Sequence, residues 1–246
     1  MPVMESAEKL ARIIQGAERI VFFGGAGTST ESGIPDFRSA SGLYRTESGF
    51  EYPPETMLSR SFFDRHPDEF FAFYRAKMLH PDSKPSGAHR ALARLEREGR
   101  LTGIITQNID GLHQLAGSRR VVELHGSVLR NTCMNCGHKH PLSTVTGSSE
   151  IVPHCPACSG IIKPDVVLYE ESLDLSTLEQ AVQLLQEADL LMVGGTSLTV
   201  TPAAALVRYF RGNQLVLLNK TATAYDRAAD LIIRDNMGEV LEVAVR

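Results

Sequence analysis

The stretch that decides the fold lies at residues 20–30 and reads Ile-Val-Phe-Phe-Gly-Gly-Ala-Gly-Thr-Ser-Thr. Its apolar beginning, Ile20–Phe23, is typical of a short parallel strand that is covered on both faces. Glycines directly after such a strand let the backbone approach a pyrophosphate, and a helix N-terminus beyond them favours the anion. Thr30 replaces the third glycine of the full Gly-x-Gly-x-x-Gly pattern. The turn at Gly25-Ala26-Gly27 therefore indicates a nucleotide site but equally fits a plain tight turn.

Strand-like and helix-like segments alternate along the rest of the chain. Apolar residues recur three and four positions apart in 88–95 and 178–185, and Pro202 suits the first turn of a helix over 203–210. This alternation predicts right-handed βαβ units and an α/β fold with a Rossmann-like, doubly wound parallel sheet. The strands expected after the first are six short apolar runs: Ile104–Thr106, Val121–Leu124, Val166–Leu168, Leu190–Val193, Leu215–Leu218 and Leu231–Ile233.

Two regions interrupt the alternation. Residues 32–80 show no strand pattern and carry aromatic side chains between 62 and 74, which favours a helical insert. Residues 127–163 hold all the cysteines together with Gly, Ser and Pro, which favours a zinc-binding insert. We expect the two inserts to form one small domain. The larger, nucleotide-binding domain would then consist of residues 1–31, 81–126 and 164–246.

The four cysteines have the spacing Cys-x2-Cys-x18-Cys-x2-Cys. Disulfide frameworks serve mainly small secreted domains, whereas this spacing is typical of a structural zinc site. Four thiolate ligands leave no open position for a catalytic water, so we expect one zinc ion with a structural role. Its predicted ligands are Cys133, Cys136, Cys155 and Cys158.

Composition excludes several classes of protein. The chain has 246 residues, of which 43% are hydrophobic and 22% charged, an ordinary balance for a globular protein with its own core. With 25 basic and 29 acidic residues the net charge is −4, which argues against non-specific binding to nucleic acid or anionic membranes. No apolar run approaches the roughly 18 residues of a membrane span, and residues 1–10 lack the apolar core of a signal peptide. We therefore expect a cytoplasmic protein without nucleic-acid or membrane partners.

Four further motifs carry side chains suited to a nucleotide. Asp36-Phe37-Arg38 would let a ring cover a cofactor while the charges hold its ribose or phosphates, or would form an ordinary surface loop. Gln107-Asn108-Ile109-Asp110 follows a strand at the edge where doubly wound folds bind ligands, although its polar side chains could equally cap a helix. Gly195-Thr196-Ser197 and Asn219 also stand where strands end, and suit phosphate or adenosine hydroxyls.

His125 also stands at the end of a predicted strand. An unperturbed histidine pKa of about 6.5 suits a general base at neutral pH. The chain has eight histidines, however, and His113 is nearly as well placed. Position alone leaves the choice between the two open.

Taken in order, these motifs resemble the sirtuins, a family of NAD-dependent protein deacylases. The resemblance covers about residues 19–240 and rests on ordered signatures. They comprise Gly25–Thr30 with Ser32–Arg38, Thr106–Asp110, Leu124-His125-Gly126, the two cysteine pairs, Lys163–Val167, Gly195–Leu198 and Asn219.

The resemblance assigns roles to individual residues. It implies that His125 is the catalytic base, that Asn108 acts beside it facing the nicotinamide ribose, and that Val166-Val167-Leu168-Tyr169 pairs in β fashion with the substrate backbone. Without the resemblance, the last segment reads as a plain parallel strand. The implied NAD contacts are Gly25, Ala26, Gly27, Thr30, Asp36, Phe37, Arg38, Gln107, Asn108, Ile109, Asp110, Gly195, Thr196, Ser197, Asn219, Lys220 and Met237.

The implied activity is NAD-dependent protein-lysine deacetylation, with acetyl-lysine peptides or proteins as substrates and NAD as a cosubstrate. The acyl oxygen would attack the nicotinamide ribose, nicotinamide would leave, and His125 would deprotonate a ribose hydroxyl on the way to O-acetyl-ADP-ribose. Desuccinylation and mono-ADP-ribosyl transfer remain alternatives within the same fold. An NAD-dependent dehydrogenase is disfavoured because no acidic residue ends a strand about 20 residues after the glycines. A zinc-ribbon nucleic-acid module is disfavoured because the insert carries few basic residues.

Several positions depart from the sirtuin pattern. Thr28 replaces the usual Ile, Ser39 the usual Gly, and Tyr169-Glu170-Glu171 the usual Phe-Gly-Glu. The two glutamates add charge beside the expected peptide channel and leave its sequence preference open. Some sirtuins bind succinyl-lysine through a Tyr and an Arg three residues apart, and here Lys77 stands three residues after Tyr74. Lys lacks the planar fork that matches a carboxylate, so the sequence predicts acetyl-lysine over succinyl-lysine.

Overall fold

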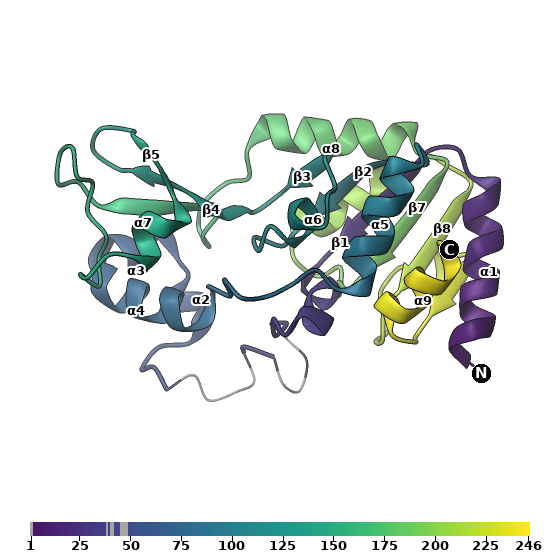
Figure 1. The fold of residues 1–246 in the computed structure, drawn as a ribbon, viewed down its shortest axis with the longest axis horizontal. Helices are drawn as coiled ribbons and strands as arrows, with labels where there is room; N and C mark the ends of the chain where they lie inside the picture. Colours follow the sequence, from purple (N-terminus) through teal and green to yellow (C-terminus); the bar gives the residue numbers. More distant parts are fainter. Residues whose placement is uncertain (1, 38, 40–41, 45–48) are drawn as a thin grey trace.

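The computed structural model describes residues 2–37, 39, 42–44 and 49–246. Within these ranges a six-stranded sheet has the order β3-β2-β1-β7-β8-β9, and every neighbouring pair is parallel (Figure 1). The chain runs outward from the centre in both directions, so the strand order reverses between β1 and β7. The predicted doubly wound sheet is confirmed. Its strands are β1 (Ile20–Gly24), β2 (Leu101–Thr106), β3 (Val121–Glu123), β7 (Leu190–Gly194), β8 (Gln214–Leu218) and β9 (Leu231–Ile233).

Helices cover both faces of this sheet because successive strand residues point to opposite sides. Ile20 and Phe22 pack with α1 (Pro2–Gly16), α5 (Gly87–Arg97) and α9 (Met237–Ala244). Val21 and Phe23 pack on the other face with α8 (Leu175–Glu187) and the 3-10 helix η3 (Ala203–Tyr209). The helix predicted after Pro202 is thus present in 3-10 form. Helix α1 has no counterpart among the predicted elements.

A second, antiparallel sheet has the order β5-β4-β6 and lies at the end of the molecule opposite the two termini (Figure 1). One hydrophobic cluster joins it to the helices that precede α5, so residues from both predicted inserts share a core. The boundaries of the two domains stay predictions. The elements of this region are α2 (Pro54–Met57), α3 (Arg60–Arg65), α4 (Pro67–Lys77), β4 (Gly126–Cys133), β5 (Lys139–Pro141), α7 (Leu142–Thr146) and β6 (Ile162–Val166).

The prediction of a parallel strand at Val166–Leu168 is wrong. The strand there is β6, which ends at Val166 and pairs antiparallel with β4. A short apolar run is compatible with either a parallel or an antiparallel strand. Here β6 pairs with β4, whose last residue is Cys133, and this pairing is antiparallel.

Short elements connect the larger ones. The glycine turn leads into two 3-10 turns, η1 (Ala26–Thr28) and η2 (Thr30–Ser32), while α6 (Leu112–Leu115) follows β2 and η4 (Asp226–Ala228) precedes β9. None of the helices in the part of the chain that the model describes is long and apolar enough to cross a membrane.

Candidate functional site

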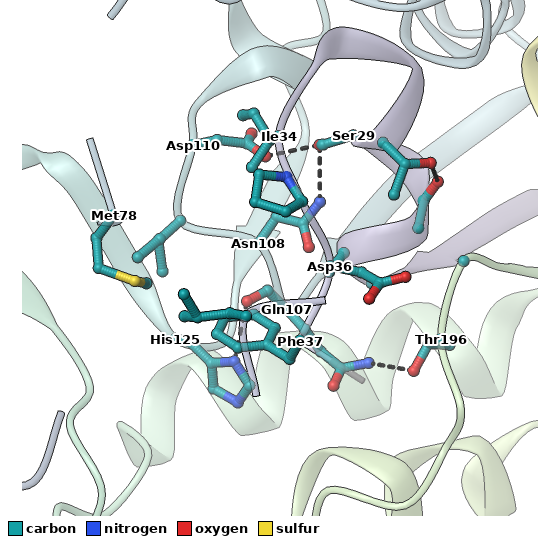
Figure 2. A pocket seen from close by; sticks show the side chains of 18 of the residues that line it. Ser29, Ile34, Asp36, Phe37, Met78, Gln107, Asn108, Asp110, His125 and Thr196 are labelled. Atoms are coloured by element: carbon teal, nitrogen blue, oxygen red, sulfur yellow. Dashed lines mark hydrogen bonds between the residues drawn. The ribbon is translucent and has the colours of Figure 1, made fainter. Parts of the chain in front are cut away.

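A cavity of about 960 Å³ opens at the carboxyl ends of the parallel strands, where the strand order reverses. Doubly wound folds bind ligands at this position. Every predicted nucleotide or peptide contact lines this cavity except Arg38, which lies outside the described residues. His125 lines it as well (Figure 2), whereas His113 is buried in α6.

The glycines of the first turn serve a close contact within the chain. A Cβ on Gly27 would lie 2.6 Å from the Cα of Gly195, and a Cβ on Gly25 would lie 2.7 Å from the Cβ of Thr196. Gly27 also donates its N–H to the Gly195 carbonyl at 2.8 Å, and Gly195 has a φ of 62°. The turn after β1 and the loop after β7 are therefore locked together, which fixes two walls of the cavity.

Ser29 connects Asn108 and Asp110, two polar side chains of the Gln107–Asp110 motif. Asn108 Nδ2 donates to Ser29 Oγ at 3.0 Å, and Ser29 Oγ donates to Asp110 Oδ2 at 2.7 Å (Figure 2). The other Asp110 oxygen accepts the Leu112 N–H at 2.9 Å. Ser29 is buried and was not among the predicted contacts, although it belongs to the quoted Gly-Ala-Gly-x-Ser-Thr stretch.

His125 is oriented by the backbone of the same motif. Its ring Nδ1 lies 2.9 Å from the carbonyl oxygen of Gln107. Since a carbonyl can only accept, Nδ1 carries the proton and Nε2 is the basic nitrogen. Burial lowers the pKa of His125, and the bond to Gln107 opposes that shift. The ring is therefore held neutral near pH 7, as a general base requires.

One predicted adenosine contact, Asn219, is engaged within the protein, and so is the residue that follows Met237. The Asn219 side-chain oxygen accepts the Thr196 N–H at 3.0 Å, and its amide nitrogen donates to the Thr196 carbonyl at 2.8 Å. Beside Met237, the backbone N–H of Gly238 donates to Glu31 Oε1 at 3.0 Å. Asn219 thus braces the loop after β7, which also receives a 3.0 Å hydrogen bond from Gln107 Nε2 to Thr196 Oγ1.

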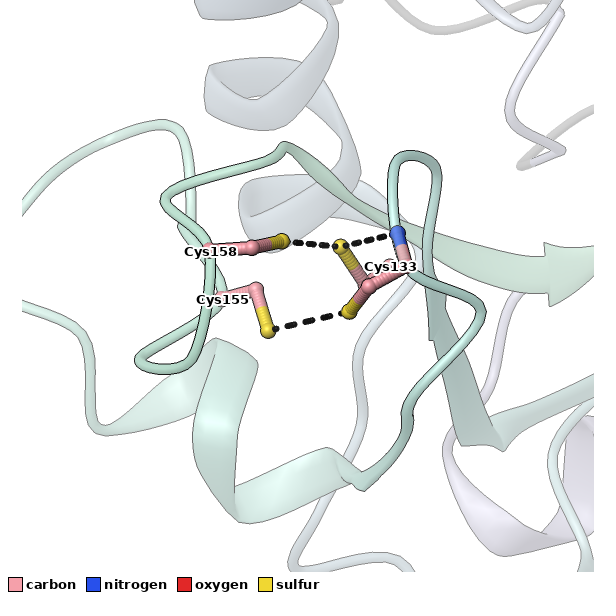
Figure 3. A group of neighbouring side chains, drawn as sticks. Cys133, Cys155 and Cys158 are labelled. Carbon is pink, nitrogen blue, oxygen red and sulfur yellow. Dashed lines mark hydrogen bonds between the residues drawn. The ribbon is translucent and has the colours of Figure 1, made fainter.

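The four cysteines converge beside the second sheet, and none of them lines the cavity. Their sulfur atoms all lie within 4.8 Å of one another, and none is in a disulfide (Figure 3). Cys133 and Cys158 are 3.4 Å apart, and Cys136 and Cys155 are 3.7 Å apart. Tetrahedral zinc with bonds of about 2.3 Å places its sulfur ligands roughly 3.8 Å apart, so the group fits one zinc ion. A closed set of four thiolates makes that ion structural.

Fold and site together define a nucleotide-binding α/β protein with a structural metal centre in an insert. The model of the Sir2 family matches residues 25–202. The chain belongs to the Sir2 family, as the sequence resemblance to the sirtuins predicts.

Relatives match over the whole chain. A protein of Clostridium acetobutylicum is 56% identical over 245 residues and covers 100% of both chains. One of Cutibacterium acnes is 57% identical over 241 residues and covers 98% of each. Both are named NAD-dependent protein deacetylase. A solved Sir2 complex with a deacetylated p53 peptide and 3′-O-acetyl-ADP-ribose superposes with a TM-score of 0.87 at 36% identity, covering 97% of this chain and 96% of that one.

Proposed function

We propose that this protein is an NAD-dependent protein-lysine deacetylase that releases nicotinamide and O-acetyl-ADP-ribose. One observation carries the proposal beyond the similarity to named deacetylases. A single cavity is lined by the predicted nucleotide motifs, by His125 and by the segment Val166–Tyr169, for which the sequence predicts peptide binding. A protein that only bound a dinucleotide would not need the last of these three.

We assign the nicotinamide half of NAD to the Asn108–Ser29–Asp110 network. When bound, NAD supplies an electrophilic ribose carbon and a leaving group. Asp110 retains acceptor capacity for a carboxamide N–H, since each carboxylate oxygen has two lone pairs and accepts one bond here. Asn108 is held by Ser29 so that its side-chain oxygen is presented to the cavity (Figure 2). The glycine turn and residues 195–197 would receive the phosphates, and residues 219, 220 and 237 the adenosine.

We assign proton transfer to His125. Nε2 is the nitrogen that would take a proton from a ribose hydroxyl, because Nδ1–H is bound to the Gln107 carbonyl. The resulting imidazolium keeps this hydrogen bond, which stabilises the charge as it forms.

We assign the peptide to the edge of the Val166–Tyr169 segment. Val167 donates its N–H to the His125 carbonyl at 2.9 Å, which places the segment directly beside the proposed base. Main-chain pairing gives affinity with little demand on the peptide sequence.

The test is mass spectrometry of an acetylated peptide incubated with the protein, with and without NAD. The expected result is NAD-dependent loss of the acetyl group, with nicotinamide and O-acetyl-ADP-ribose in equal amounts. Absorbance at 340 nm in the same reaction should stay flat. A rise at 340 nm without deacetylation would instead identify a dehydrogenase, and modification of the peptide by ADP-ribose would identify a transferase.

We further propose a cytoplasmic location and no nucleic-acid partner. Four unpaired cysteines suit a reducing compartment, and the net charge of −4 disfavours binding to phosphate backbones.

A further inference from the structure

Charged side chains that the proposed reaction does not use hold the Val166–Tyr169 segment in place. Most backbone groups of the segment bind other parts of the protein, whereas the Val167 carbonyl accepts no hydrogen bond from the described residues and so stays open to the main chain of a peptide. The Tyr169 N–H donates to the Leu58 carbonyl at 3.0 Å, and the Tyr169 carbonyl accepts the Arg60 N–H at 2.9 Å. The outer end of the segment is thereby paired with the start of α3.

Glu171 closes the turn that follows. Its Oε2 accepts the Leu168 N–H at 2.9 Å and a bond from Lys163 Nζ at 3.2 Å, while Oε1 accepts from Arg60 Nη1 at 3.1 Å. The Glu171 side chain is only 20% exposed, and that of Lys163 only 11%. One carboxylate therefore joins the segment to β6 and to α3.

Lys163 holds the other end of the segment. Its ammonium group donates to the Val166 carbonyl at 3.0 Å and to the Pro164 carbonyl at 3.2 Å. Burial lowers the pKa of Lys163, and the nearby Glu171 opposes that shift. Without the Glu171 carboxylate, a nearly buried ammonium would lose its counter-charge, which is costly in such surroundings.

Glu170 is engaged as well. It has a φ of 75°, unusual for a residue with a side chain, and its carboxylate accepts the Ser61 N–H at 2.8 Å and the Ser61 hydroxyl at 2.9 Å. Glu170, which replaces the usual Gly of the sirtuin pattern, and Glu171, which matches its Glu, thus both bind groups of the protein itself.

We propose that Glu171 is a positioning residue for the acyl-lysine peptide, and that neither Glu170 nor Glu171 selects peptides by positive charge. The proposal rests on the proposed function, since it assumes that the Val166–Tyr169 segment binds the substrate. Glu171 acts through the Leu168 N–H and Lys163, and so sets the path of the segment without touching the reacting atoms.

The test compares Glu171→Ala, Glu171→Gln and the matched control Asp64→Asn. Asp64 pairs with Arg60 Nε at 3.0 Å but touches no part of the segment. Glu171→Ala should raise the peptide KM at least tenfold, and Glu171→Gln, which keeps an acceptor for Leu168, about threefold. NAD affinity, measured by calorimetry without peptide, should stay within twofold, and Asp64→Asn should match the wild type in both.

Equal weakening of peptide and NAD binding in Glu171→Ala would reduce Glu171 to a general structural role and overturn the proposal. An unchanged peptide KM in both Glu171 variants would overturn it too. Failure of the proposed function is distinguishable, because the wild type itself would then leave acetylated peptides intact.

The charge part of the proposal is tested with three peptides that differ only in the residues flanking acetyl-lysine, which are all Lys, all Ala or all Glu. The wild type should process them with kcat/KM values within threefold of one another. A tenfold preference for the Lys peptide that disappears in Glu170→Gln would show that the carboxylate reads charge.

Discussion

The rings of His89 and His113 pack against each other, with their centroids 4.6 Å apart, their planes tilted by 57° and both residues at most 1% exposed. His89 Nδ1 lies 2.8 Å from the Ser86 hydroxyl, whereas His89 Nε2 and both His113 ring nitrogens have no hydrogen-bond partner among the residues described. Burial lowers the pKa of His89 to about 4 and that of His113 to about 3. Nearby Asp110 opposes the shift of His89 while Arg90 adds to it, and His89 adds to the shift of His113.

This pair predicts acid lability. The folded state favours neutral rings, whereas the unfolded chain takes up protons near pH 6.5. The stabilisation is therefore complete above pH 6.5 and is lost as the pH falls toward the folded pKa values. Each ring should lower the free energy of unfolding by on the order of 1 kcal/mol between pH 6 and pH 5. Urea unfolding at pH 7, 6 and 5 measures this.

His113→Asn should lose less stability between those pH values than the wild type, because one titrating group is gone. His66→Gln is the control, since it removes a histidine whose side chain is 43% exposed. Identical slopes for His113→Asn and the wild type would contradict the prediction.

His125→Ala should abolish deacetylation while NAD still binds, because the proposed role of the ring is to move a proton. Turnover by mass spectrometry and NAD affinity by calorimetry give the two measurements. His138→Ala, a substitution away from the cavity, is the control. Wild-type turnover in His125→Ala would remove the residue from the mechanism.

Cys133→Ser or Cys158→Ser should lose zinc and lower the melting temperature, since metal binding at a structural site contributes to folding free energy. Activity should fall only as a consequence, because none of the four cysteines lines the cavity. Metal analysis of the purified wild type should give one zinc per chain. A chain that contains no metal and is insensitive to chelators would refute the zinc assignment.

The chain should prefer acetyl-lysine to succinyl-lysine by at least roughly tenfold in kcat/KM, about 1.4 kcal/mol. Tyr74 and Lys77 both line the cavity, but Lys77 offers a point charge without a planar fork. Arg75 donates to the Glu150 carbonyl at 2.9 Å and does not line the cavity. One peptide carrying either acyl group gives the comparison, and Lys77→Arg should narrow the difference. Equal values in the wild type would mean that Lys77 serves as a carboxylate anchor.

Much of the parallel sheet could be predicted because its strands are buried on both faces and so read as uninterrupted apolar runs. Six of the seven predicted strands lie in that sheet. The antiparallel sheet was not predicted, because β4 mixes buried Val128 with exposed Leu129 and Arg130 and pairs beside the predicted metal ligands. Helix α1 was missed although the sequence signals it, since its buried Ala7, Leu10 and Ile14 recur three and four positions apart, as the apolar residues of the predicted helices do.

The candidate site could likewise be predicted only in part. The motifs at strand ends converge because parallel strands place their carboxyl ends at one edge. The hydrogen-bond partners of the residues in these motifs could not be predicted, because they come from segments distant in the sequence. The pairing of Asn219 with the backbone of Thr196 is an example. Ser29 was passed over for the same reason, since its partners Asn108 and Asp110 lie 79 and 81 residues away.

The hydrophobic cluster that contains Tyr74 shares no residue with the two clusters that flank the parallel sheet. We therefore predict that acyl-chain preference and NAD binding depend on separately packed parts of the chain. We expect exchanges of the cavity-lining side chains of α4 to alter the acyl-chain preference, while the contact between Gly27 and Gly195 stays as it is. A library restricted to the cavity-lining positions of α4 should therefore change which acyl groups are accepted while the use of NAD is preserved.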